Sequence, residues 1–333
     1  MTRHSRQWNH ATLKPLLEGV VADVRAAAPA RYEEAIAAAE AKGKKPPNKG
    51  DFDAFGIAVF TAEGELVSAG NAGVAFPIQS ISKLFALEVA LAGLGEKLWD
   101  RVGREPSGDP FNSIIDLERL KGIPRNPFIN AGALVVCDAL VSLATRRKSL
   151  QVVDLVRDML DGEAIELDDG VVASGRTGGH LNRSLMSMAK HHGNLDNELD
   201  AVMDAYATQC AIRLDARGLA RAGRFLMHDD PDAGPDQERG VAAAKRARRI
   251  MALMMLCGQY DGSGDFAYRV GLPAKSGVGG GILAIAPHRA SIAVFSPALD
   301  PMGNSWLGTL GLEMLTDRTD WSVFGSVRTL SRG

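Results

Sequence analysis

The chain has 333 residues, of which 46% are hydrophobic and 23% charged, and its formal net charge is −2. This length allows one large domain or two modest ones, and the composition is that of an ordinary globular protein. The near balance of charge argues against nucleic acid or an anionic membrane surface as a partner, and long apolar runs that would predict a signal peptide or a transmembrane helix are lacking.

The first part of the chain predicts a long helix followed by a β-hairpin. Residues 12–42 are rich in alanine, which favours helix. Residues 55–60 and 65–69 are short runs of strand-forming residues, and the four residues between them end in Gly64. This spacing is typical of a hairpin.

The next segment places a serine and a lysine at the start of an apolar helix. Pro77 and Gly93 bracket a helix of about four turns, with Ser80 in its first turn and Lys83 three residues later. Residues three apart lie on one helix face, so the hydroxyl and the amine can meet. Burial and the helix N-terminus would both lower the pKa of Lys83, as a general base requires. The same spacing also fits an N-cap serine and a solvated lysine.

Strand character returns near the end of the chain, after a mostly helical stretch from residue 80 to 259. Residues 282–286 and 290–295 predict two strands, and a helix is expected from residue 304 or 305 to 316. Strands near both ends with helices between them predict an α+β fold, in which both chain ends complete one antiparallel sheet with flanking helices and an inserted helical domain.

This arrangement predicts a division of the chain into two parts that form a single catalytic unit. Residues 1–95 and 262–333 form the sheet-containing domain, and residues 96–261 form the mostly helical domain.

The cysteines and histidines argue against disulfides and metals. Cys137, Cys210 and Cys257 are odd in number and far apart, which fits buried thiols in a reducing cytoplasm. A catalytic cysteine is the alternative interpretation. Because the seven histidines form no HExxH pattern, no metal site and no cofactor are expected.

A glycine-rich segment, residues 272–281, precedes the strand at residue 282. Its glycines indicate a backbone that passes close to another group, and no helix follows them as in a phosphate-binding loop. Lys275-Ser276-Gly277 at a strand edge, together with Ser-x-x-Lys on a buried helix, is the pairing found in penicillin-recognising serine acyl-transfer enzymes. The backbone N–H groups of Ser80 and Val278 would then form the oxyanion hole.

Taken together, these motifs show that the chain resembles the serine-dependent glutaminase family, which has the β-lactamase and penicillin-binding-protein fold. The resemblance extends from about residue 55 to about residue 315. It rests on six motifs in order, at residues 76–83, 106–113, 122–133, 258–260, 273–281 and 296–300.

The resemblance implies a hydrolase of linear amide C–N bonds that converts L-glutamine to L-glutamate and ammonia. It implies that Ser80 attacks the side-chain amide, that Lys83 takes the proton, that Tyr260 relays a proton to the leaving nitrogen, and that water cleaves the acyl-enzyme. The substrate-binding residues it implies are Gln79, Ser80, Asn130, Asn182, Tyr206, Tyr260 and Val278. Taken alone, each polar side chain among them also fits a cap, a turn or a buried structural role.

Two positions depart from the family pattern. Gly175 stands where the family has a glutamate that helps to hold the substrate's ammonium, and Arg176 follows it. Val24 stands where the family has a substrate-binding tyrosine, and Tyr32 lies close enough in sequence to be a substitute. Both departures affect substrate recognition, and the nucleophile and base remain.

These departures leave two alternatives beside a glutaminase. One is an amidase for a related amide that lacks the α-ammonium, and the other is a binding protein that has lost turnover. As partners, the family implies L-glutamine and a homo-oligomer of two or four subunits, and the cysteine usage indicates the cytoplasm.

Overall fold

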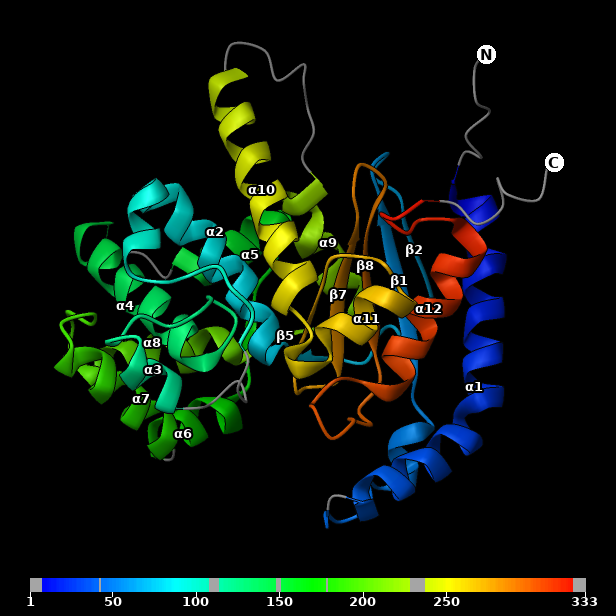
Figure 1. The fold of residues 1–333 in the computed structure, drawn as a ribbon. Helices are drawn as coiled ribbons and strands as arrows, with labels where there is room; N and C mark the ends of the chain where they lie inside the picture. The colour runs from blue at the N-terminus through cyan, green and yellow to red at the C-terminus, as the bar shows by residue number, and fades with distance from the viewer. Residues whose placement is uncertain are drawn as a thin grey trace.

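The computed structural model describes residues 8–41, 43–107, 114–147, 151–177, 179–227 and 237–325, with the side chains of residues 145–147, 151, 176–177 and 237–239 excepted. A part built on a β-sheet and a part built of helices lie side by side (Figure 1). Among the described helices, none is both long enough and apolar enough to cross a membrane.

The main sheet has five antiparallel strands in the order β2-β1-β8-β7-β6. The strands are β1 (Gly56–Thr61), β2 (Leu66–Gly70), β6 (Ala274–Ser276), β7 (Gly281–Ala286) and β8 (Ala290–Phe295). β1 and β2 form the predicted hairpin, and β8 pairs with both β1 and β7. The prediction that both ends of the chain complete one antiparallel sheet is therefore confirmed.

Alternating residues of the central strands serve two separate cores, as the period of two in a strand requires. Ile282 and Ala284 face a cluster that includes residues of α1 (His10–Ala41) and α12 (Trp306–Thr319). Leu283 and Ile285 face a cluster with residues of α9 (Ala216–Ala222) and α2 (Ser82–Leu94). Because both faces are covered, all residues of β7 and β8 are buried.

The helices at the two ends of the chain confirm their predictions. α1 agrees with the helix expected at residues 12–42 to within two residues, and it packs against α12 and β2. α12 begins after Ser305, whose Oγ accepts a hydrogen bond from the backbone N–H of Gly308 at 3.1 Å. Serine is a preferred N-cap for this reason.

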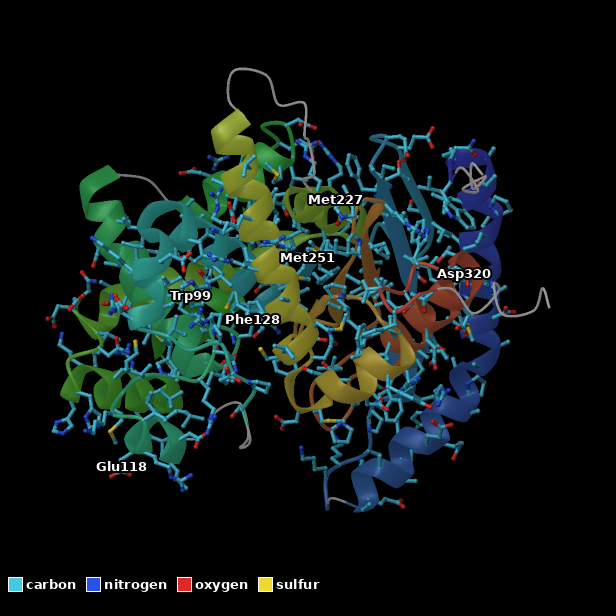
Figure 2. All side chains as sticks on the ribbon, turned by 45° about the horizontal axis from the view of Figure 1, so that its top comes forward. Trp99, Glu118, Phe128, Met227, Met251 and Asp320 are labelled. Carbon is cyan, nitrogen blue, oxygen red and sulfur yellow. The ribbon has the colours of Figure 1, made fainter. Side chains whose placement is uncertain are left out.

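α2 lies at the centre of the helical part. It is surrounded by α4 (Asn130–Arg147), α5 (Gln151–Met159), α8 (Leu199–Cys210) and α10 (Gln237–Cys257). This surrounding explains why its sequence is apolar on nearly all sides. Phe128 and Met251, labelled in Figure 2, belong to the cluster that joins these helices to the sheet.

The remaining elements are short. They are η1 (Lys49–Phe52), η2 (Gln79–Ile81), η3 (Gly95–Asp100), α3 (Ile115–Arg119), α6 (Asp169–Thr177), α7 (His180–His191), η4 (Gly223–Met227), η6 (Tyr260–Gly262) and α11 (Ser263–Arg269). α9 and η4 belong to the segment assigned to the helical domain, yet they pack on β1 and β8. The domain boundaries at residues 95 and 262 stay a prediction.

A second, three-stranded sheet was not predicted from the sequence. It has the order β3-β5-β4, with β3 (Phe76–Pro77), β4 (Glu166–Leu167) and β5 (Ile212–Leu214). Strands of two or three residues are too short to show alternation in a sequence. The pairing of β3 with β5, extended by the hydrogen bond from Ile78 N to Ile212 O at 2.8 Å, fixes the segment before Ser80 beside the end of α8.

Candidate active site

A pocket of about 430 Å³ lies where the start of α2 meets α4, α6, α8 and the connection after β6. All seven residues expected to bind substrate line it, namely Gln79, Ser80, Asn130, Asn182, Tyr206, Tyr260 and Val278. They come from segments 200 residues apart in the chain, and the fold brings them together. Of the motif at residues 106–113, residues 108–113 lie outside the described part of the chain.

Ser80 lies in the short 3₁₀ turn η2, just before α2 begins at Ser82. The Tyr260 hydroxyl lies next to its side chain and donates a hydrogen bond to the carbonyl oxygen of Ser276 at 3.3 Å. Burial raises the pKa of Tyr260 to about 12, so this hydroxyl keeps its proton at neutral pH. The serine therefore has a neutral proton-relay group beside it.

Lys83 is buried below the pocket and donates to two oxygens at the start of α4. The distances from its Nζ are 3.0 Å to the carbonyl oxygen of Phe128 and 2.9 Å to Oδ1 of Asn130. Burial lowers its pKa to about 8. The structure contains no hydrogen bond between the Lys83 amine and the Ser80 hydroxyl. The amine instead finds its acceptors at the start of α4, at Phe128 and Asn130.

A chain of amides connects Lys83 to the far wall of the pocket. Asn130, the first residue of α4, accepts from Lys83 and donates its Nδ2 to Oδ1 of Asn182 on α7 at 3.2 Å. Tyr206 on α8 is buried next to them, beside the Cys210 thiol. Burial raises the pKa of Tyr206 well above its usual value, so its phenol stays neutral.

Lys275, which the sequence placed in a motif without assigning it a role, is a second buried lysine. It lies in β6, and its Nζ donates to the Ser276 carbonyl oxygen at 2.7 Å. The same nitrogen lies 4.3 Å from the centroid of the Tyr260 ring. Burial lowers its pKa well below the usual value, with a further contribution from Lys83. Lys275 supports Tyr260 from the side of the sheet.

The glycine-rich segment passes close to the backbone before Ser80, as predicted. A Cβ at Gly277 would lie 2.4 Å from the carbonyl oxygen of Ile78, and one at Gly279 would lie 2.2 Å from that of Pro77. Only glycine permits this approach. Between these glycines, Val278 reaches the pocket, and the backbone N–H groups of Val278 and Ser80 donate to no group in the described part of the chain. Two free donors at this place suit an oxyanion hole.

Two residues of the pocket have backbone angles that are unusual for their type. Gln79 has φ 49° and Tyr260 has φ 52°, in the left-handed region that favours glycine. Such conformations cost about 1 to 3 kcal/mol each and often occur at functional sites. Asn304 helps to hold the backbone conformation of Tyr260, because its Nδ2 donates to the carbonyl oxygen of the preceding residue, Gln259, at 3.0 Å.

The two departures from the family pattern have different structural settings. Val24 is fully buried on α1 within the core below the sheet, and Tyr32 packs edge-on against Phe52 at 5.5 Å and does not line the pocket. Gly175 does line the pocket, and a Cβ there would lie 2.5 Å from that of Ala207 on α8. The methyl group of Ala207 therefore occupies the space that a side chain at position 175 would need.

The sequence reasoning missed a carboxylate in the pocket. Asp168 lies before α6, where its Oδ1 accepts from the backbone N–H of Val171 at 3.0 Å. Its Oδ2 is 3.9 Å from Nη1 of Arg213, and a quarter of the side chain is exposed. An aspartate before a helix is a common N-cap, so the sequence offered no separate signal for a site. The side chain of Arg176 is outside the described part of the chain.

Thiol and metal chemistry gain no support from the geometry. Cys137, Cys210 and Cys257 are free and buried, and burial raises the pKa of each thiol, to about 12 for Cys257. Thiols of this kind are inert at neutral pH. Within the described ranges, no group of three or more histidine, cysteine, aspartate or glutamate side chains is placed to hold a metal ion.

Comparisons with known proteins agree with this geometry. The sequence model of the family described as Glutaminase matches residues 48–324. A relative from Methylobacterium radiotolerans named Glutaminase is 52% identical over 277 residues, which are 83% of this chain and 89% of the relative. A crystal structure of a probable glutaminase from Bacillus subtilis is 30% identical, with a TM-score of 0.78, and the match covers 95% of this chain and 99% of that one.

A second crystal structure bears on the chemistry. It is the covalent complex between a Bacillus subtilis glutaminase and 5-oxo-L-norleucine, formed by reaction with 6-diazo-5-oxo-L-norleucine. This neighbour is 29% identical with a TM-score of 0.73, and the match covers 94% of this chain and all of that one. The part of this chain that the family model matches, residues 48–324, contains every residue that lines the pocket.

Proposed function

Because this chain belongs to the glutaminase family, we propose that Ser80 is the nucleophile with which it hydrolyses L-glutamine. The chain is an amidohydrolase with the β-lactamase-like fold of that family, and its reaction converts glutamine to glutamate and ammonia. The observation that carries the proposal is the setting of Ser80: the Tyr260 hydroxyl lies beside it, and the backbone N–H groups of Ser80 and Val278 donate to no group among the described residues. The covalent complex of the Bacillus subtilis relative supports a covalent route.

In the first half of the reaction, the Ser80 oxygen bonds to the side-chain amide carbon of glutamine. The N–H groups of Ser80 and Val278 stabilise the oxyanion, a contribution of about 3 to 4 kcal/mol per donor where measured. The C–N bond then breaks, and the nitrogen leaves as ammonia after gaining a proton. In the second half, water attacks the acyl-enzyme and releases glutamate, which restores the serine hydroxyl.

Lys83 is the base in this proposal. Its pKa of about 8 leaves roughly a tenth of the amines neutral at pH 7. The amine accepts the serine proton after it turns from the Phe128 carbonyl oxygen toward Ser80, a tightening of contacts that is common when substrate binds. Tyr260 carries a proton to the leaving nitrogen, because its hydroxyl touches Ser80 and keeps its proton at this pH.

The amide and phenol groups of Asn130, Asn182 and Tyr206 bind the α-carboxylate and α-ammonium of the substrate without adding net charge. Asp168 supplies the negative charge for the ammonium. It is the carboxylate among the described residues that line the pocket, and Gly175 provides none. An ammonium–carboxylate hydrogen bond contributes about 1.5 to 3 kcal/mol.

The chain acts in the cytoplasm as a homo-oligomer of two or four subunits in this proposal. Three free, buried cysteines support a reducing compartment. The family resemblance supports the assembly.

The decisive experiment measures ammonia release from L-glutamine by the wild type, Ser80→Ala and Ser82→Ala. Ser82 is a matched control, because it is a buried serine two residues away that contacts Cys210 and does not line the pocket. We expect turnover by the wild type and by Ser82→Ala, and a loss of roughly 10⁴-fold or more in Ser80→Ala.

Mass spectrometry after reaction with 6-diazo-5-oxo-L-norleucine tests the covalent step separately. We expect an adduct on the wild type and none on Ser80→Ala. Thermal stabilisation by glutamine without ammonia release from the wild type would instead identify a binding protein. An adduct on Ser80→Ala would place the nucleophile on another residue.

A further inference from the structure

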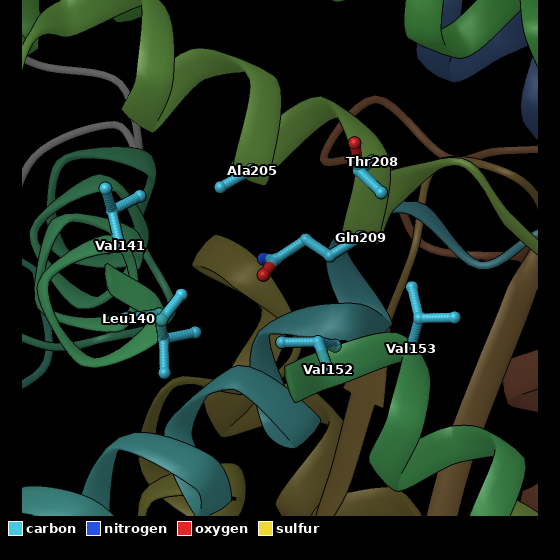
Figure 3. Close-up of a pocket in the computed structure, with 8 residues that line it drawn as sticks. Leu140, Val141, Val152, Val153, Ala205, Thr208 and Gln209 are labelled. Atoms are coloured by element: carbon cyan, nitrogen blue, oxygen red, sulfur yellow. The ribbon is translucent and has the colours of Figure 1, made fainter. Parts of the chain in front are cut away.

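A second cavity lies behind α8, on the side of this helix away from the active-site pocket. Its volume is about 80 Å³, and it lies between α4, α5 and α8 (Figure 3). Met203, Tyr206, Ala207 and Cys210 of α8 face the active-site pocket, and Ala205, Thr208 and Gln209 face the cavity. A period of 3.6 residues per turn places these two sets on different faces of the helix.

The walls of the cavity are mostly apolar, and the two polar side chains that line it are Gln209 and Thr208. The lining residues besides those of α8 are Leu140, Val141, Ala144, Val152 and Val153. Gln209 is 2% exposed, and its Nε2 has no hydrogen-bond partner among the described residues. Figure 3 shows the amide end of Gln209 in the space between Leu140, Val152 and Ala205. Its Oε1 accepts a hydrogen bond from the Cys137 thiol at 3.5 Å, so Nε2 is the end of the amide that can donate to a bound molecule.

An unmet buried donor is costly, which makes the Gln209 amide a group that a bound molecule can satisfy. A buried donor without a partner costs about 1 to 3 kcal/mol, and most such groups in native proteins are satisfied. Water fits in volume, since one molecule needs roughly 10 to 15 Å³. Water also needs two to four polar partners. Besides Gln209, the lining offers one polar side chain, Thr208, and Figure 3 shows its hydroxyl directed away from the amide end of Gln209.

The walls also exclude a charged ligand. Among the described residues that line the cavity, none is charged, and an unpaired ion in an apolar site is strongly disfavoured. What fits is an apolar body with one oxygen that accepts a hydrogen bond.

We propose that this cavity is a binding site for a small uncharged organic molecule with a compact apolar body and one carbonyl-type acceptor. The acceptor oxygen takes the hydrogen bond from Nε2 of Gln209, and the body contacts Leu140, Val152 and Ala205. The site is separate from the pocket that contains Ser80, because α8 stands between them.

Two probes of the same shape test the proposal, cyclopentanone and methylenecyclopentane, which differ in the acceptor oxygen. Binding to the wild type is measured by ligand-observed NMR, with thermal shift as a second readout. We expect cyclopentanone to bind roughly fivefold more tightly, the value of one net hydrogen bond. Both probes should bind Ser80→Ala as they bind the wild type, which separates this site from the catalytic proposal.

Three variants locate the binding. Gln209→Leu removes the donor, so methylenecyclopentane should bind it at least as well as cyclopentanone. Ala205→Leu fills the cavity from α8 and should bind neither probe. Ala201→Leu is the matched control, because Ala201 lies one turn earlier on the same helix face, is exposed and does not line the cavity, and this variant should bind both probes as the wild type does. Circular dichroism and ammonia release show that each variant is folded.

Equal binding of the two probes to the wild type would overturn the role of Gln209. Binding that persists in Ala205→Leu would place the probes elsewhere. If neither probe binds the wild type, the cavity is not a site for this class of molecule. The Gln209→Leu variant keeps the proposal testable if Ala205→Leu fails to fold.

Discussion

Two walls of the active-site pocket each contain a buried lysine, and the two lysines have different surroundings. The helical wall is formed by α2, α4, α6, α7 and α8, and the sheet wall by β6, the segment that follows it and Tyr260. Lys83, on the helical wall, donates to Phe128 and Asn130, and Asn130 continues to Asn182 at the substrate side. Lys275, on the sheet wall, donates to the Ser276 carbonyl oxygen and lies over the Tyr260 ring. Burial lowers the pKa of both. Burial alone therefore does not identify the base, and the partners of each amine decide its role.

The two walls also differ in how closely they follow the family. The sheet wall keeps the Lys-Ser-Gly motif, Tyr260 and Val278, whereas Gly175 departs from the family pattern on the helical wall. In the proposed mechanism, Val278 on the sheet wall shares the oxyanion hole with Ser80 and Tyr260 on the same wall relays a proton, whereas the helical wall supplies the base and substrate recognition. Changes on the helical wall should therefore separate chemistry from binding.

The largest expected effect is that of Lys83→Met. Loss of the base should lower kcat by about 10² to 10⁴. The free energy of unfolding at pH 7 should rise, because the folded protein no longer has to hold a charged amine in a dry site. A pKa of about 8 against about 10.4 in the unfolded chain corresponds to about 3 kcal/mol. The lost hydrogen bonds offset part of this, at about 0.5 to 1.5 kcal/mol each.

Urea unfolding at pH 7 and ammonia release measure the two effects of Lys83→Met. The comparison variant is Lys275→Met on the sheet wall. It should lower kcat less, because Lys275 acts on the reaction through Tyr260 and contacts neither Ser80 nor the pocket. A loss from Lys275→Met as large as that from Lys83→Met would move the base to the sheet wall.

Much of the fold was predictable, because its elements carry strong local signals. The hairpin at β1 and β2, the strands β7 and β8 and the capped helix α12 each combine a clear periodicity with turn or cap residues. The three short strands β3, β4 and β5 carry no such signal. They matter nevertheless, because β3 and β5 fix the position of the residues before Ser80.

The members of the site were predictable by motif, and their contacts were not. The sequence named Ser80 and Lys83 and expected them to meet, but the Lys83 amine donates to Phe128 and Asn130 instead. Asp168 and the contact between Gly175 and Ala207 depend on how α6 packs against α8. Such pairings between distant segments leave no trace in local periodicity.

The next largest effect tests recognition on the helical wall. Asp168→Asn removes the charge that we assign to the substrate's ammonium and keeps an oxygen that can cap α6 at Val171. We expect KM for glutamine to rise about 10- to 150-fold, the equivalent of 1.5 to 3 kcal/mol. The values of kcat and Tm should stay close to those of the wild type.

Asp169→Asn is the matched control for this charge. Asp169 is the next residue, is exposed and does not line the pocket, so the substitution should leave KM unchanged. An unchanged KM in Asp168→Asn would show that the ammonium is bound by neutral groups alone.

The smallest effect is the pH dependence of kcat/KM, which reports on the free enzyme. Lys83 must be neutral to accept a proton, so the rate should rise with pH through about 8, by about tenfold from pH 7 to pH 9. Tyr260 adds no falling limb in this range, because its pKa is about 12. A profile that is flat from pH 7 to pH 9 would contradict the assignment of Lys83 as the base.

The free energy of unfolding should also depend on pH through Lys83, and the direction of this dependence can be measured. The folded pKa of Lys83 is lower than the unfolded one, so between pH 8 and about 10.4 the unfolded chain binds more protons at this residue. The contribution of Lys83 to the free energy of unfolding therefore rises with pH in that window and is constant below it. Other groups also titrate in this pH window. The difference in the free energy of unfolding between the wild type and Lys83→Met isolates the contribution of Lys83. The stability advantage of Lys83→Met should shrink as pH increases from 8 to 10, while kcat/KM of the wild type approaches its plateau. A stability change that begins at the pH where kcat/KM has its midpoint would assign both changes to one amine on the helical wall.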